Sequence, residues 1–212
     1  MNEHLADLPA RELIERLATS DPIPGGGSAA ALAGAMSAAL VQMVVALTVG
    51  RPASTEHEGV LTDIARAARA AQSDLLKLAE LDAAAYEAVV LARRLPRGTP
   101  RERQARDVQI STTTREATMV PLDTARRAGT VLELAERLAP IGNRNAISDV
   151  GVGALLAATA LRGAGLNVRI NLPHLAADDP LRADAARDLD EMLAGLDERE
   201  RAIRETVEGR LG

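Results

Sequence analysis

The chain has 212 residues, enough for one domain with a full hydrophobic core, and a formal net charge of −5 at pH 7. It contains no cysteine, phenylalanine or tryptophan and only one tyrosine, Tyr86. This composition excludes disulfides and thiol chemistry. The lack of a basic excess and of aromatic stacking platforms argues against a nucleic-acid partner.

The N-terminal segment is predicted to form a short amphipathic helix over residues 10–18, with leucine and isoleucine at helical spacing. Residues 1–20 are too polar for a secretory signal peptide, so we expect a cytoplasmic protein. Residues 19–27 are predicted to be a loop, because two prolines in it each disfavour helix at the preceding residue.

Residues 29–50 are almost all small or apolar and predict a central helix, capped by Ser28 or Gly27 and ended by Gly50. A membrane span is the alternative, since the length suffices. However, alanine and glycine contribute little to insertion, and no tryptophan or tyrosine belt flanks the segment. The pattern therefore favours a buried helix whose small residues admit close neighbours, and we expect no membrane partner.

A long helix is predicted over residues 56–94, because aliphatic residues there follow an unbroken heptad spacing. The seam comprises Leu61, Ile64, Ala68, Ala71, Leu75, Leu78, Asp82, Ala85 and Val89. Asp82 is the one charged member of this seam. A carboxylate in such a place loses hydration and needs either a partner or a raised pKa. The seam alone leaves two interpretations open, a functional acid and a buried polar residue that sets helix register.

A second long helix is predicted over residues 101–139, weakened by three consecutive threonines at 112–114 and kinked at Pro121. After it, a polar loop leads to a helix predicted from 150 to 165, capped by Ser148 or Asp149. Residues 167–172 are predicted either to extend that helix or to form an irregular end.

A last, highly charged helix is predicted over residues 178–211. Alternating strand patterns are absent from the sequence. We therefore expect an all-α fold over residues 1–212. It would be a single-domain helical bundle with a buried small-residue central helix and long flanking helices.

Two polar groups at helix starts are further candidates for binding. The turn Gly25-Gly26-Gly27-Ser28 can present backbone N–H groups to an anion or carboxylate, although a plain tight turn explains it equally well. It lacks the lysine of a P-loop. The second group is Asn143, Asn145, Ser148 and Asp149, in which capping accounts for the last two residues but not for the asparagines. The three histidines lie in unrelated contexts, so no metal site is expected.

Taken together, these segments resemble the formimidoyltetrahydrofolate cyclodeaminase / methenyltetrahydrofolate cyclohydrolase family. The resemblance runs in the family's order from about residue 8 to 180. The matching blocks are Pro22–Ser28 with its Ala/Gly helix, Leu81–Tyr86, Val120-Pro121-Leu122, Gly142-Asn143 with Ser148-Asp149, and Asn167-Val168 with Asn171-Leu172. One departure is that Arg51-Pro52-Ala53-Ser54 replaces a Lys-rich segment after Gly50.

The resemblance implies an all-helical homodimer with a folate cleft near the subunit interface and Asp82 as the catalytic acid/base. It implies a substrate-binding set that also includes Tyr86 beside Asp82 and Arg51 as the remaining cation after Gly50. The rest of that set is Gly25, Gly26, Gly27, Ser28, Asn143, Asn145, Ser148, Asp149, Asn167 and Asn171. Neither a metal nor a redox cofactor is required.

The expected activity is conversion of 5-formimidoyltetrahydrofolate to 5,10-methenyltetrahydrofolate plus ammonia, with Asp82 moving the protons. The alternative within the family is methenyltetrahydrofolate cyclohydrolase, which adds water to the cationic methenyl bridge. The alternative from another class is a non-catalytic helical interaction protein in which Asp82 only sets register.

Overall fold

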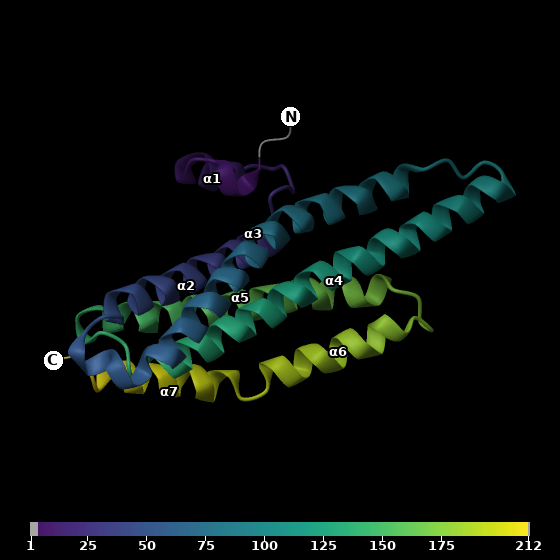
Figure 1. The fold of residues 1–212 in the computed structure, drawn as a ribbon. Helices are drawn as coiled ribbons and strands as arrows, with labels where there is room; N and C mark the ends of the chain where they lie inside the picture. The colour runs from purple at the N-terminus through teal and green to yellow at the C-terminus, as the bar shows by residue number, and fades with distance from the viewer. Residues whose placement is uncertain (1–3, 212) are drawn as a thin grey trace.

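The structure is a computed structural model that describes residues 4–211, apart from the side chain of Ala53. All regular structure in this part of the chain is helical, and the helices form an elongated bundle (Figure 1). The α-helices are α1 (Ala10–Leu17), α2 (Gly26–Thr48), α3 (Glu58–Arg94), α4 (Pro100–Leu138), α5 (Ile147–Asn171), α6 (Pro180–Leu193) and α7 (Leu196–Glu208). Short 3₁₀ segments cover Leu5–Asp7, Pro52–His57, Arg144–Ala146 and Leu172–His174. The predicted all-α fold class is confirmed.

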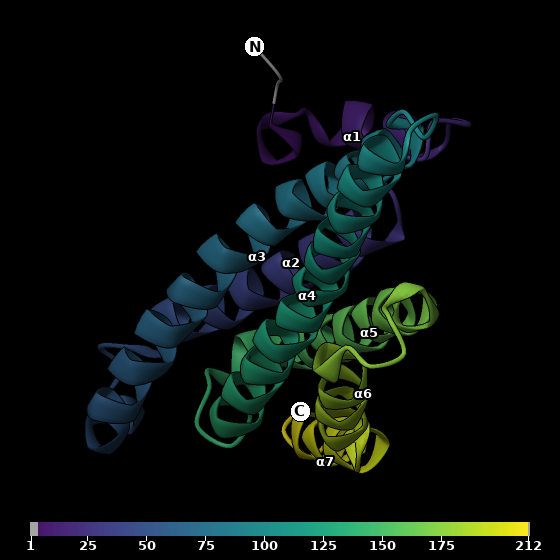
Figure 2. The ribbon, with the colours of Figure 1, turned by 90° about the vertical axis from the view of Figure 1, so that its right-hand side faces the viewer.

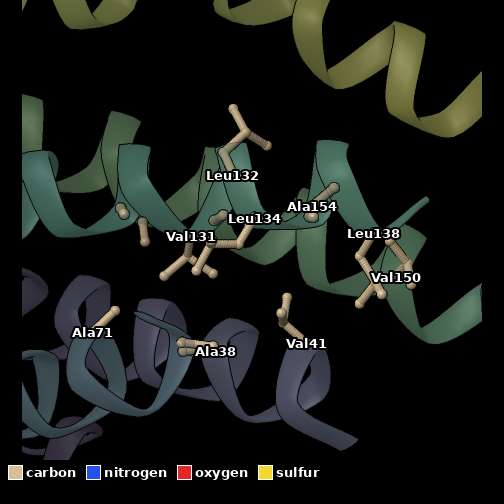
Figure 3. Close-up of a cluster of buried hydrophobic side chains, with 14 of the residues drawn as sticks. Ala38, Val41, Ala71, Val131, Leu132, Leu134, Leu138, Val150 and Ala154 are labelled. Atoms are coloured by element: carbon tan, nitrogen blue, oxygen red, sulfur yellow. The ribbon is translucent and has the colours of Figure 1, made fainter. Parts of the chain in front are cut away.

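Helices α2 to α5 make the core. Each of α2 and α4 packs against both α3 and α5, so the four helices surround one hydrophobic interior (Figure 2). Ala38 and Val41 of α2 lie across this core from Val131 of α4 and Val150 of α5 (Figure 3). All four side chains are fully buried. The central small-residue helix is therefore buried along one side only, whereas its apolar sequence predicts a buried core helix; Met36 on its other side is 55% exposed.

Small residues on α2 set how closely its neighbours approach. A Cβ added at Gly34 would lie 3.1 Å from both methyl carbons of Leu75 on α3, closer than ordinary contact. Ala31, which is fully buried, lies one turn before Gly34 on the same helix. Leu75 belongs to the predicted heptad seam, and most of that seam is buried in the bundle. The periodicity therefore identified the inner face of α3 correctly.

Helix α4 begins at a capping box, in which Thr99 accepts from the backbone N–H of Glu102 and Glu102 accepts from that of Thr99. It continues without interruption through the threonine run and past Pro121. The Thr113 hydroxyl donates to the carbonyl of Gln109 at 2.9 Å, which returns a polar side chain to the helix's own backbone. Beyond the bundle, α3 and α4 project together as a helical hairpin (Figure 1).

Two predicted caps are wrong. Helix α2 begins at Gly26 with Gly25 at its N-cap position, so Gly27 and Ser28 lie inside its first turn. Helix α5 begins at Ile147, which places Ser148 and Asp149 in its first turn rather than at its cap. In both cases a tertiary contact or a preceding 3₁₀ turn starts the helix earlier than the polar residues suggest.

The predicted last helix is also wrong as a single element. Gly195 has a φ of +68°, a left-handed conformation that glycine adopts without steric cost, and it separates α6 from α7. The break allows α6 to pack on α4 and α5 while α7, which continues along the bundle in the direction of α6, packs mainly on α5 (Figure 1). Helix α1 forms as predicted but buries none of its residues, and it lies outside the bundle in both ribbon views (Figures 1 and 2).

Candidate active site

Asp82 lies against the first turn of α2. The Ser28 hydroxyl oxygen is 3.0 Å from Asp82 Oδ2 and 2.9 Å from the carbonyl oxygen of Ala79, so Ser28 ties α2 to this turn of α3. A Cβ added at Gly27 would lie 2.0 Å from Asp82 Oδ1. Only glycine leaves room for the carboxylate at that position. Gly27 and Ser28 therefore fix the position of the Asp82 side chain, a role that the sequence pattern did not reveal.

Burial raises the pKa of Asp82 above its ordinary value of 3.8, and hydrogen bonds from the side chain and the backbone N–H of Ser28 oppose part of that rise. The positive end of the α2 dipole acts in the same direction as these bonds, since it favours a negative charge at the helix start. The carboxyl group is consequently held in place and exchanges its proton closer to neutral pH than a surface aspartate does.

A cleft of about 320 Å³ opens beside this carboxylate. It is lined by Pro22, Ile23, Gly25, Gly26, Gly27, Asp82, Ala83, Ala85, Tyr86, Val89, Arg93, Ala117, Asn167, Ile170, Asn171 and His174. The structure therefore brings together residues from the glycine turn, from α3 and from the end of α5 that the resemblance assigns to one site. Ser28 is buried behind the cleft.

Asn167 and Asn171 both line the cleft, and the side-chain amide of each donates to a backbone carbonyl. The Nδ2 group of Asn167 donates to the carbonyl of Gly163 at 2.9 Å, and that of Asn171 donates to the carbonyl of Ala117 at 2.6 Å. These bonds orient both amides, so their oxygens remain as acceptors for a ligand. A ligand whose ring carries N–H and NH₂ donors can form hydrogen bonds to two such acceptors.

Two polar residues of the cleft were missed by the sequence analysis. Arg93 lines it from the last turn of α3, and His174 lines it from the 3₁₀ turn after α5. A signal for Arg93 was present, because Asp82, Tyr86, Val89 and Arg93 continue one heptad spacing on one helix face. Arg93 places a cationic side chain near the carboxylate site.

The other predicted binding residues lie elsewhere in the chain and do not line this cleft. Arg51, Asn143 and Asn145 line a separate pocket beyond the C-terminal end of α2. Helix α2 separates the two places by about 33 Å at 1.5 Å per residue. The first turn of α5, which carries Ser148 and Asp149, starts at that same distant end.

Asn143 has a structural role that explains its position. Its backbone N–H donates to the Thr48 hydroxyl at 2.9 Å, and its Nδ2 group donates to the carbonyl of Leu47 at 3.0 Å. Its side-chain oxygen accepts from the N–H of Asn145. Each polar atom of this side chain thus has a protein partner, and together the bonds fasten the end of α2 to the loop before α5.

Within residues 4–211, histidine and carboxylate side chains do not gather into any group of three or more that could hold a metal ion.

Comparison with known proteins places this chain in one family. The family model described as Formiminotransferase-cyclodeaminase matches residues 9–191. The chain is 38% identical over 198 residues to the methenyltetrahydrofolate cyclohydrolase of Methylorubrum extorquens, covering 93% of this chain and 95% of that protein. It is 33% identical over 176 residues to the formimidoyltransferase-cyclodeaminase of Rattus norvegicus. That match covers 83% of this chain but only 32% of the rat protein.

The fold matches a solved structure over nearly its whole length. The crystal structure of formiminotetrahydrofolate cyclodeaminase from Thermotoga maritima superposes with a TM-score of 0.86 at 27% sequence identity. The superposition covers 98% of this chain and 100% of that one. The bacterial relatives are thus of similar length to this chain, whereas the rat relative is more than twice as long.

Proposed function

Because the chain belongs to the formiminotransferase-cyclodeaminase family, we propose that it acts on the one-carbon unit of a tetrahydrofolate derivative, with Asp82 as general acid/base. The observation that carries the assignment of Asp82 is its setting. It is the carboxylate that lines the cleft, its pKa is raised by burial, and Gly27 and Ser28 fix its position. The interpretation of Asp82 as a register-setting residue accounts for its bond to Ser28 and for the space at Gly27, but not for its position on the wall of a cleft.

The cyclohydrolase reaction is the first candidate, because a relative that is 38% identical and is covered over 95% of its own length carries that name. Water attacks the methenyl carbon and loses one proton to the Asp82 carboxylate. The resulting carbinolamine collapses, the C–N5 bond breaks, and Asp82 returns the proton to N5. The remaining hydroxyl proton leaves to solvent as the formyl C=O forms on N10. A positioned carboxylate contributes about 10²–10⁴-fold to such steps.

The cyclodeaminase reaction, which the sequence analysis placed first, is the second candidate because of the Thermotoga maritima and rat relatives. Here N10 attacks the carbon of the protonated formimino group, whose nitrogen becomes an amino group, and the N10 proton passes to Asp82. Asp82 then protonates the amino group, which leaves as ammonia while the methenyl cation forms. Both reactions share a tetrahedral carbon flanked by nitrogens, and neither changes its oxidation state, so neither needs a redox cofactor.

We assign binding roles in the cleft from the donors and acceptors present. The amide oxygens of Asn167 and Asn171 accept hydrogen bonds from the pterin N–H groups. The ring of Tyr86, about half exposed beside Asp82, stacks on the bicyclic ring. Arg93 pairs with the carboxylate of the substrate, in the place that Arg51 was expected to fill.

A direct assay tests the function. Purified protein is given methenyl- and formimino-tetrahydrofolate, and the methenyl chromophore and released ammonia are followed. Loss of the chromophore above the enzyme-free rate identifies the cyclohydrolase; its formation together with ammonia identifies the cyclodeaminase. Asp82→Asn is expected to lower the rate about 10²–10⁴-fold. Asp63→Asn, an exposed aspartate on the same helix, is the control. An unimpaired Asp82→Asn enzyme would refute the assignment.

A homodimer is part of the proposal, and an exposed apolar face supports it. Helix α2 carries no charged side chain, yet Met36, Met43 and Leu47 are each 40% or more exposed. On the neighbouring helix α5, Val152 and Leu155 are each 48% exposed. Both helices are long and apolar enough to cross a membrane, but half of each such window is buried within the bundle. We propose that a second copy of the chain covers the exposed halves.

The oligomeric state tests the dimer. Light scattering during gel filtration is expected to give a dimer, and Met36→Glu is expected to give a monomer because a charge in an apolar interface is costly to desolvate. Thr62→Glu, at an exposed position on α3, is the control. A monomeric wild-type chain at micromolar concentration, or flotation with lipid vesicles, would contradict the proposal.

A further inference from the structure

The pocket beyond the C-terminal end of α2 is rich in basic side chains. It has a volume of about 430 Å³, and three arginines and one histidine contribute to its wall. Its lining is Thr48, Arg51, Ser54, His57, Pro140, Ile141, Gly142, Asn143, Arg144, Asn145 and Arg210. Neither aspartate nor glutamate is among these described residues. Positive charge thus converges on a concave surface at the opposite end of α2 from Asp82.

Arg210 is the least exposed of the three arginines. Its Nη2 group donates to the carbonyl of Gly142 at 2.6 Å. Within residues 4–211, its Nε is the one buried side-chain nitrogen or oxygen that lacks a hydrogen-bond partner. Burial lowers the pKa of the Arg210 guanidinium, and the nearby positive charge of Arg144 lowers it further. The fold therefore holds the positive charges of Arg144 and Arg210 close together, and the buried Nε of Arg210 is a donor available to an anion.

Arg51 lines the same pocket, and its guanidinium has more N–H donors than its one bond to the backbone uses. Its Nε donates to the carbonyl of Leu47 at 2.8 Å, which fixes the side chain and leaves its two terminal NH₂ groups for a ligand. His57 also lines the pocket, and its imidazole contacts the carboxylate of Glu56 at 3.4 Å. Both arginine forks suit the paired oxygens of a carboxylate or phosphate.

This pocket is not accounted for by the proposed chemistry. It lies about 33 Å from Asp82 along α2, at 1.5 Å per residue. Arg210 also lies beyond residue 191, where the match to the family model ends. The site is thus completed by a part of the chain that the family description does not cover.

We propose that this pocket binds a multiply charged anion whose phosphate or carboxylate oxygens bridge Arg51 and Arg210. Two sources share this chemistry, inorganic phosphate and a short chain of γ-linked glutamates. Only the second source rests on the proposed folate function, because such a chain is carried by folates.

Calorimetry on the full chain, without any assay of activity, tests the site. Inorganic phosphate and γ-linked triglutamate are titrated separately into wild type, Arg210→Gln and Arg51→Gln. Arg201→Gln, an exposed residue on α7, is the control. Loss of a hydrogen bond to a charged group is expected to weaken binding about tenfold or more in each pocket variant. The control is expected to stay within twofold of wild type. Circular dichroism checks folding, and Arg51→Gln keeps the test valid should Arg210→Gln unfold, since Arg51 is exposed.

The outcomes separate the sources. Binding of phosphate alone assigns the pocket to a free anion, and tighter binding of triglutamate assigns it to a folate tail. Absence of binding by both probes, or binding that Arg51→Gln leaves unchanged, overturns the proposal. A chain that binds an anion here but lacks folate activity would refute the proposed function and leave this site intact.

Discussion

Replacing Gly27 by alanine places a methyl carbon 2.0 Å from Asp82 Oδ1 and 2.5 Å from its Cγ. Ordinary van der Waals contact begins at 3.4 Å, so the carboxylate oxygen must move by at least 1.4 Å. The direction open to it is the cleft, because α2 blocks the other side. The movement separates Asp82 from the Ser28 hydroxyl, which now lies 3.0 Å away.

The change is expected to lower both stability and rate. Alanine is favoured over glycine in a helix by up to about 1 kcal/mol, whereas a lost hydrogen bond to a carboxylate costs about 1.5–3 kcal/mol. The net loss is about 1–2 kcal/mol, which lowers Tm by roughly 2–8 °C in a domain of this size. The rate depends on position, and a 1 Å misplacement of a catalytic group costs about 10²-fold.

Paired measurements of Tm and of kcat/KM for Gly27→Ala check this reasoning. Gly59→Ala is the matched control, since Gly59 is likewise the second residue of its helix but has no atom within 4 Å of an added Cβ. It is expected to keep full activity and to gain up to about 1 kcal/mol of stability. Activity of Gly27→Ala within threefold of wild type would refute the view that Gly27 positions Asp82.

Further predictions concern titration and backbone conformation. In Ser28→Ala the pKa of Asp82 rises further, because the hydrogen bonds that lower it are weakened, so the acid limb of the pH–rate profile moves to higher pH. Since the folded pKa of Asp82 exceeds 3.8, the folded state holds this proton more tightly, and its contribution to stability falls as pH rises from about 4 through the raised pKa. Asp82→Asn is therefore expected to melt higher than wild type at neutral pH, and equal Tm values would contradict this. Gly195→Ala, at φ +68°, is expected to lose about 1–2 kcal/mol and to lower Tm by roughly 2–8 °C with unchanged activity.

The buried face of each long helix could be predicted from the sequence because burial follows the helical period. The heptad seam of α3 located Leu75 and Asp82 on one face, and the small residues of α2 marked the helix that neighbours approach closely. The resemblance joined Asp82 to the glycine turn and to Asn167. Those predictions concern patterns that repeat within a helix or a motif, so one sequence suffices to state them.

The remaining features depend on contacts between distant parts of the chain. Ser28 bonds to a residue 54 positions away, so its local pattern suggested only a cap or a turn. The distance between Arg51 and Asp82 follows from the rise of α2, which a motif order does not report. Gly195 resembled a tolerated helix glycine until its positive φ showed a break. Arg210 gains its neighbours only because α7 packs on α5.

Tyr86 combines two properties that make the chain a suitable subject for spectroscopy. It is the only aromatic residue in 212, and its ring is 46% exposed at the edge of the cleft. The near-ultraviolet emission of the protein therefore arises from one phenol beside Asp82, without any indole background. A bound ligand that absorbs at that wavelength quenches this emission by energy transfer. Occupancy of the cleft can thus be titrated in the unmodified protein, with no label introduced.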